Sequence, residues 1–163
     1  MRNPTPILGA MLVAATISGC ATTNMAGASQ GQVGPFAWEV SHIRQTRQED
    51  GREITWWFTL ALRNTGSAVI ALQRVTTGMD TPGESWGGQS NEPFVRRVKA
   101  GDEIRLDQTF TFRCRDCSPN DAEFVFRRGL VRILQFEGED ETGRPVRALV
   151  GVRLDSSTGP VLK

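Results

Sequence analysis

The chain has 163 residues, enough for one ordinary domain with short extensions, and it contains a single histidine and three cysteines. Its 19 basic and 18 acidic residues leave a formal net charge of +1. A nearly neutral chain lacks the bulk positive charge that draws proteins to nucleic acids or to anionic lipids, so no nucleic-acid partner is expected.

Residues 1–19 have the layout of an export signal. Arg2 is the only charged side chain among them, the run from Ile7 to Ile17 is apolar, and Ser18 and Gly19 are small. Crossing a bilayer takes roughly 20 apolar residues, because the hydrocarbon layer is about 30 Å thick and a helix rises about 1.5 Å per residue. The run is too short for a permanent anchor, so we predict a signal peptide over residues 1–19.

The signal ends in Ile17-Ser18-Gly19-Cys20, which resembles the lipobox of bacterial lipoproteins. The resemblance implies that the Cys20 thiol receives a diacylglycerol, that a signal peptidase cuts just before Cys20, and that the new amine is acylated, typically with palmitate. Ala21 in place of aspartate implies sorting to the outer membrane, with the protein facing the periplasm of a Gram-negative cell. Two or three lipid chains hold a protein stably on a membrane. The alternatives are an uncleaved signal and plain secretion.

A flexible tether is predicted over residues 20–34, which begin with the lipidated cysteine and continue with small, polar and glycine-rich residues. A segment without apolar periodicity cannot bury enough surface to order itself, and it reaches roughly 20 Å on average. We predict that the folded domain spans residues 35–163, which is long enough for a hydrophobic core.

Apolar residues alternate with polar ones along the predicted domain, the period of half-buried strands. The alternating apolar positions are 54, 56, 58, 60 and 62, then 104, 106, 110 and 112, then 146, 148, 150, 152 and 154. Glycine-containing turns at 63–67, 100–103 and 139–144 are predicted to join the strands as hairpins. At most a short helical turn fits 118–124. We therefore expect an all-β, antiparallel sandwich or small barrel.

The stretch "WWFTLALRNTGSAVIAL", residues 56–72, resembles the strand, turn and strand of immunoglobulin-like or fibronectin-type modules in bacterial envelope proteins. The resemblance implies an antiparallel immunoglobulin-like β-sandwich. The antibody-type spacing of two core cysteines around a tryptophan is absent, so the strand order stays open.

Cys114 and Cys117 remain as a pair if lipid occupies Cys20, and exported proteins seldom leave a cysteine unpaired. A four-residue turn brings its end Cα atoms within about 7 Å, which is compatible with a disulfide. On the loop-entropy model this disulfide contributes about 2 kcal/mol. C-x-x-C is also the thioredoxin motif, but there the nucleophilic cysteine begins a helix, whereas here a strand is expected to run into a turn. Zinc needs about four ligands, so no metal site is predicted.

Two tryptophans are predicted to bind a partner. Trp57 points away from the core series that contains Trp56, so it faces solvent, a second layer of the chain or another protein. The stretch 78–93 is long for a hairpin connection and carries Trp86, and an exposed tryptophan in a loop can anchor recognition. The alternative for each is packing against the chain itself.

No enzyme, catalytic residue or cofactor is expected. His42 has no nucleophile signature beside it and is interpreted as an ordinary strand residue, and the acidic cluster of residues 137–141 as a solvated hairpin tip. The sequence therefore predicts an outer-membrane lipoprotein whose β-sandwich is an interaction or accessory module of a cell-envelope assembly, with an unidentified protein partner. Two alternatives remain: a thiol–disulfide redox protein that uses Cys114 and Cys117, and a carrier of a small apolar ligand.

Overall fold

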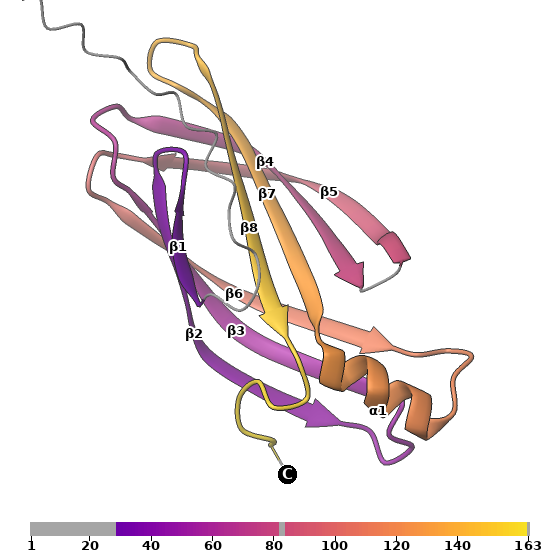
Figure 1. The fold of residues 1–163 in the computed structure, drawn as a ribbon. Helices are drawn as coiled ribbons and strands as arrows, with labels where there is room; N and C mark the ends of the chain where they lie inside the picture. The colour runs from indigo at the N-terminus through magenta and orange to yellow at the C-terminus, as the bar shows by residue number, and fades with distance from the viewer. Residues whose placement is uncertain (1–28, 82–83, 163) are drawn as a thin grey trace, which may run out of the picture.

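The computed structural model describes residues 29–81 and 84–162, and the side chains of this part except those of residues 81–89. Two four-stranded antiparallel sheets and one helix make up the described chain (Figure 1), which confirms the all-β class. The elements are β1 (Gln30–Val33), β2 (Phe36–Arg47), β3 (Glu53–Asn64), β4 (Ile70–Thr81), β5 (Glu84–Val98), β6 (Glu103–Arg113), α1 (Pro119–Arg128), β7 (Leu130–Asp140) and β8 (Pro145–Leu154). The signal peptide and Cys20 lie outside the described residues.

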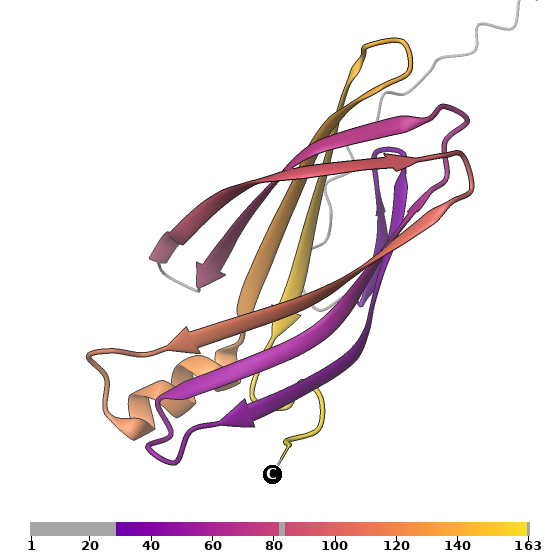
Figure 2. The same cartoon turned by 180° about the vertical axis from the view of Figure 1, so that it is seen from behind.

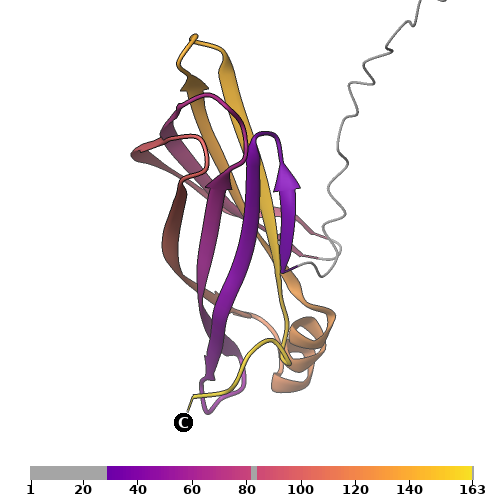
Figure 3. The same ribbon diagram turned by 90° about the vertical axis from the view of Figure 1, so that its left-hand side faces the viewer.

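The strands run in the order β1-β2-β3-β6 in one sheet and β5-β4-β7-β8 in the other. Figure 3 shows the two sheets as separate layers, with β8 beside β1 and β2, whose residues it approaches closely. Helix α1 lies at one end of the two layers, between β6 and β7 in the chain, as Figure 2 shows from behind. The described strands therefore form a two-sheet sandwich rather than a closed barrel.

The core between the sheets is built from the alternating apolar residues. All five predicted inward positions of β3, from Ile54 to Leu62, are buried, and the predicted strands at 104–112 and 146–154 lie within β6 and β8. Trp56 is fully buried and links three elements. Its ring stacks on Phe110 of β6 at 5.9 Å between centroids and meets the edge of Phe126 of α1 at 6.4 Å.

Helix α1 is longer than the single turn predicted at 118–124. It spans ten residues, Pro119–Arg128, and begins with a capping box in which Ser118 and Asp121 bond to each other's backbone N–H groups. Ala122 and Phe126, four residues apart, are buried on its inner face, so the helix covers one end of the core. In the described part of the chain, no helix is both long and apolar enough to span a membrane.

Only one of the three predicted hairpin turns closes a hairpin. Residues 141–144 join the paired strands β7 and β8, whereas 65–69 and 99–102 carry the chain from one sheet to the other. Asn64 lies where these two connections meet, and its fully buried side chain donates from Nδ2 to the carbonyls of Ala68 at 2.8 Å and Val98 at 3.0 Å. This one side chain thus ties the end of β3 to the starting region of β4 and the end of β5.

Ordered structure begins before Pro35, inside the segment predicted as tether. β1 pairs with the first residues of β2, and Gly31 lies opposite Trp38. A Cβ on Gly31 would come within 2.9 Å of the indole Nε1 of Trp38, so glycine makes room for this buried ring. Backbone pairing with β2 and the close approach of Gly31 to Trp38 order this segment. Neither interaction requires alternating apolar residues, so the sequence pattern does not reveal the strand.

Candidate functional site

The two tryptophans predicted as partner anchors lie on different sheets. Trp57 is in β3, on the outer face of the β1-β2-β3-β6 sheet, and it is half-buried. The backbone of Trp86 lies in β5 of the other sheet, and its side chain is outside the described side chains. The long connection predicted over 78–93 is wrong, because residues 78–81 and 84–93 belong to β4 and β5. Three register shifts in this pairing hide the strand period from the sequence.

Trp57 is the largest outward side chain of β3, and shorter residues lie on either side of it along the strand. The outward residues of β3 around it are Thr55, Thr59 and Ala61, which are short and half-buried. Strands β2 and β6 flank β3 and present outward side chains of mixed length. The longer, exposed ones are Glu39, Arg44, Arg105 and Asp107, and the short ones are Ser41, Thr46, Thr109 and Thr111.

Hydroxyl groups fix the side chains around Trp57. The hydroxyls of Thr55 and Thr111 lie 2.8 Å apart, and the Thr59 hydroxyl donates to Asp107 Oδ1 at 2.8 Å. Cross-strand pairs of this kind hold neighbouring side chains in one arrangement. The register places Arg44 and Thr109 directly beside Trp57. The indole therefore lies in a polar frame of fixed geometry.

A hollow of about 460 Å³ continues this face toward β1. Its lining includes the small residues Ala37 and Ala61, with Glu39, Arg63 and Glu103 around them. Arg105 Nε donates to Glu103 Oε1 at 2.8 Å beside the hollow, and this hydrogen bond raises the pKa of Arg105 above its ordinary value. Sequence reasoning missed the hollow, because its two alanines lie on different strands and only the register brings them together.

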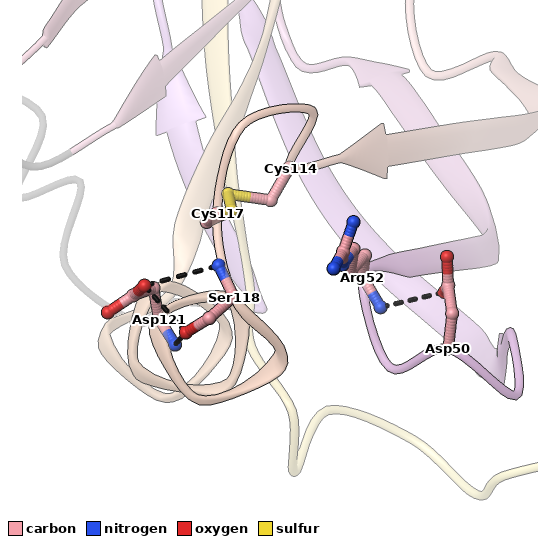
Figure 4. Close-up of a disulfide and its surroundings, with 6 residues drawn as sticks. All are labelled: Asp50, Arg52, Cys114, Cys117, Ser118 and Asp121. Carbon is pink, nitrogen blue, oxygen red and sulfur yellow. Dashed lines mark hydrogen bonds between the residues drawn. A yellow bond between two sulfur atoms is a disulfide. The ribbon is translucent and has the colours of Figure 1, made fainter.

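Cys114 and Cys117 are joined as a disulfide, in line with the prediction (Figure 4), and their Cα atoms are 5.7 Å apart. Cys114 donates its N–H to the carbonyl of Arg52 at 2.9 Å, and both cysteines pack against the core. Figure 4 also shows Arg52 across from the disulfide, with its backbone N–H donating to Asp50 Oδ1 at 3.0 Å. Within the described residues, the buried Nε of Arg52 has no hydrogen-bond partner.

A helix of ten residues follows the cysteines, where a strand running into a turn with at most a short helical turn was predicted. Cys117 immediately precedes Ser118, the N-cap of α1, whereas Cys114 directly follows the end of β6 and does not begin the helix. The nucleophilic cysteine of the thioredoxin motif begins a helix, so the first cysteine here differs from that motif. A redox role for the pair stays a prediction.

His42 lies on β2, as expected, but it is not an ordinary strand residue. The pairing of β2 with β3 slips between Ser41 and Arg44, and His42 takes a φ of 54° in this bulge. Its Nδ1 lies 3.1 Å from the hydroxyl of Ser41. The C-terminal segment approaches the same bulge, because a Cβ on Gly159 would come within 2.5 Å of the Ile43 carbonyl. Within the described residues, no group of three or more potential metal ligands occurs.

Comparisons with known proteins show the fold alone. No family model matches the chain, and no curated protein matches it. Among solved structures, a structural-genomics target called SoR45 matches with a TM-score of 0.58 and 9% identity, over 78% of this chain and 91% of that one. A protein from Bordetella pertussis described as putative ApaA matches with a TM-score of 0.55 and 13% identity, over 77% of this chain and 98% of that one.

Proposed function

We propose that this protein is an outer-membrane lipoprotein, anchored by lipid on Cys20, whose β-sandwich is an interaction or accessory module of a cell-envelope assembly. The observation that carries the proposal is the Ile17-Ser18-Gly19-Cys20 motif at the end of a short apolar signal. The half-buried Trp57 in its polar frame supports the second part, because partly exposed tryptophans are frequent anchors of recognition.

The short stretch of chain between Cys20 and β1 limits how far the domain can lie from the membrane. Ten positions separate Cys20 from Gln30, so even a fully extended connection spans at most about 36 Å. The sandwich therefore works within a few tens of ångströms of the lipid headgroups. A partner within this layer, rather than a freely diffusing ligand far from the membrane, fits a tether of this length.

An immunoglobulin-like arrangement is proposed for the sandwich. If β2, β3 and β6 are strands A, B and E, then β5, β4, β7 and β8 take the places of C′, C, F and G. Immunoglobulin sandwiches have A, B and E on one sheet and C, F and G on the other, with C′ added beside C in the variable type. The matching order supports the proposal, with β1 as an additional strand beside A.

Replacement of Cys20 tests the anchor. In cells fed labelled palmitate, the wild-type protein is expected to carry the label and to fractionate with outer membranes, whereas Cys20→Ser is expected to lose both properties. The double variant Cys114→Ser/Cys117→Ser is the control, because it removes the other cysteines and is expected to keep the label. A Cys20→Ser protein that fractionates with membranes like the wild type would contradict the proposal.

A further inference from the structure

We propose that the outer face of the β1-β2-β3-β6 sheet binds an uncharged glycan chain that lies along β3, with Trp57 as the platform on which one sugar ring stacks. This inference rests on the proposed function, because it names the chemical class of partner for the same Trp57 surface. The shape of the face, its charge and its polar groups each support this proposal.

The shape of the face fits an extended chain. The outward residues of β3 from Thr55 to Ala61 are short apart from Trp57, and most of the residues beside them on β2 and β6 are short as well, so a chain lying along β3 meets an open surface. Trp57 and Ala61 are four residues apart, or about 13 Å at about 3.3 Å per residue. This surface and the hollow at Ala61 together exceed the length of a single sugar ring, so the face suits an oligomer better than a monosaccharide.

The charge of the face fits an uncharged ligand. Four arginines and four carboxylates lie on it with the two signs mixed across the strands: Arg44, Arg63, Arg105 and Arg113 with Glu39, Glu53, Glu103 and Asp107. A polyanion such as a nucleic acid or a sulfated polysaccharide would meet as much repulsion as attraction here. A neutral chain of hydroxyl groups meets none, and it can both donate to the carboxylates and accept from the guanidinium groups.

The groups around Trp57 are those that recognise sugars. An indole ring offers a flat apolar surface with a negative face, which attracts the slightly positive C–H groups on one side of a pyranose ring. Thr109 and Arg44 beside it, and the paired Thr59 and Asp107, offer hydrogen-bonding groups to the ring hydroxyls. Among the described outward residues of β2, β3 and β6, Trp57 is the one large aromatic side chain, and most of the others carry hydroxyl or charged groups that can bond to sugar hydroxyls.

Binding of defined oligosaccharides tests the proposal. The mature lipidated protein in detergent micelles is titrated with cellohexaose, chitohexaose and a heparin hexasaccharide, and affinity is followed by calorimetry. At least one of the two uncharged hexasaccharides is expected to bind, and heparin is expected to bind more weakly. Trp57→Ala is expected to weaken binding at least tenfold, and Trp57→Phe, which keeps an aromatic platform, to weaken it less.

Val95→Ala is the matched control, since Val95 is an exposed apolar residue on β5 of the other sheet and its loss should leave affinity unchanged. Thermal unfolding of each variant verifies that the fold is retained. Binding of neither uncharged hexasaccharide, preferred binding of heparin, or equal affinity in Trp57→Ala would overturn the glycan proposal. In-cell crosslinking distinguishes the two proposals. If a protein crosslink disappears in Trp57→Ala and no glycan binds, the glycan proposal is overturned and the proposed interaction module is retained.

Discussion

Asp140 holds the turn between β7 and β8 through several hydrogen bonds to residues of the turn. Its carboxylate accepts from the hydroxyl of Thr142 at 2.6 Å and from the backbone N–H groups of Thr142 and Arg144 at 2.8 and 3.1 Å. Arg144 Nε adds a contact of 2.9 Å. The hydrogen bond from the Thr142 side chain is the main cause that lowers the pKa of Asp140 to about 2.

The lowered pKa of Asp140 predicts a loss of stability in acid. An aspartate in an unfolded chain has a pKa of about 3.9, so the charged carboxylate stabilises the fold fully above about pH 4, and this contribution is lost as the pH falls toward about 2. Asp140→Asn is therefore expected to show a shallower dependence of the free energy of unfolding on pH in this window, measured by urea unfolding. Glu139→Gln, an exposed neighbour, is the control. Equal slopes in wild type and Asp140→Asn would refute this assignment.

Helix α1 is the element whose local sequence specifies it most completely. Ser118 Oγ accepts from the backbone N–H of Asp121 at 3.3 Å, and the Asp121 carboxylate accepts from the Ser118 N–H at 3.2 Å. The hydrogen bond with the Ser118 side chain lowers the pKa of Asp121. At the other end, Arg127 and Arg128 lie in the last turn, where positive charge suits the helix dipole. The disulfide just before Ser118 then joins this start to the end of β6.

Loss of the Ser118 cap predicts a measurable destabilisation. Ser118→Ala leaves a backbone N–H of the first turn without its partner, and the expected loss is about 1 kcal/mol in the free energy of unfolding. Ser67→Ala is the matched control, because Ser67 is an exposed serine in the connection between β3 and β4. Urea unfolding measures both variants, and a loss in Ser118→Ala no larger than in Ser67→Ala would show that the cap contributes nothing.

At the scale of the whole molecule, the two sheets and the helix meet at Trp56. Its neighbour Trp57 has the same size and lies on the same strand, but it points to the outer face. Two neighbouring residues of one strand therefore place one tryptophan in the core and the other on the outer face. Trp56 Nε1 also donates to the carbonyl of Asp155 at 3.3 Å, which ties the end of the second sheet to the first.

The same alanine substitution at the two tryptophans is expected to lower the free energy of unfolding by very different amounts. Trp56→Ala removes a fully buried aromatic side chain and is expected to cost about 3–5 kcal/mol, a large fraction of the stability of an ordinary domain. Trp57→Ala is expected to cost at most about 1.5 kcal/mol, because only part of its surface is buried. Chemical denaturation with two independent probes measures both, and a larger loss for Trp57→Ala would reverse the assignment of the two faces.

The sequence by itself determined the buried side of the regularly alternating strand β3, the all-β class and the pairing of Cys114 with Cys117. These properties are local, because the period of two records side-chain direction and a four-residue turn limits the distance between its ends. The sequence also contains the capping box of Ser118 and Asp121 at which α1 begins, although only a short helical turn was predicted there.

Only the tertiary structure decided which strands share a sheet. The chain at 65–69 crosses to the other layer, and the buried amide of Asn64 bonds there to Val98, far along the chain. Tertiary structure also decided β1, which is ordered by backbone pairing, and the hollow at Ala61, which needs Ala37 and Ala61 brought together by the register. The alternation of apolar and polar residues determines which face of a strand is buried. Which strands lie next to each other is determined by backbone hydrogen bonds between distant segments, and no residue type encodes this pairing on its own.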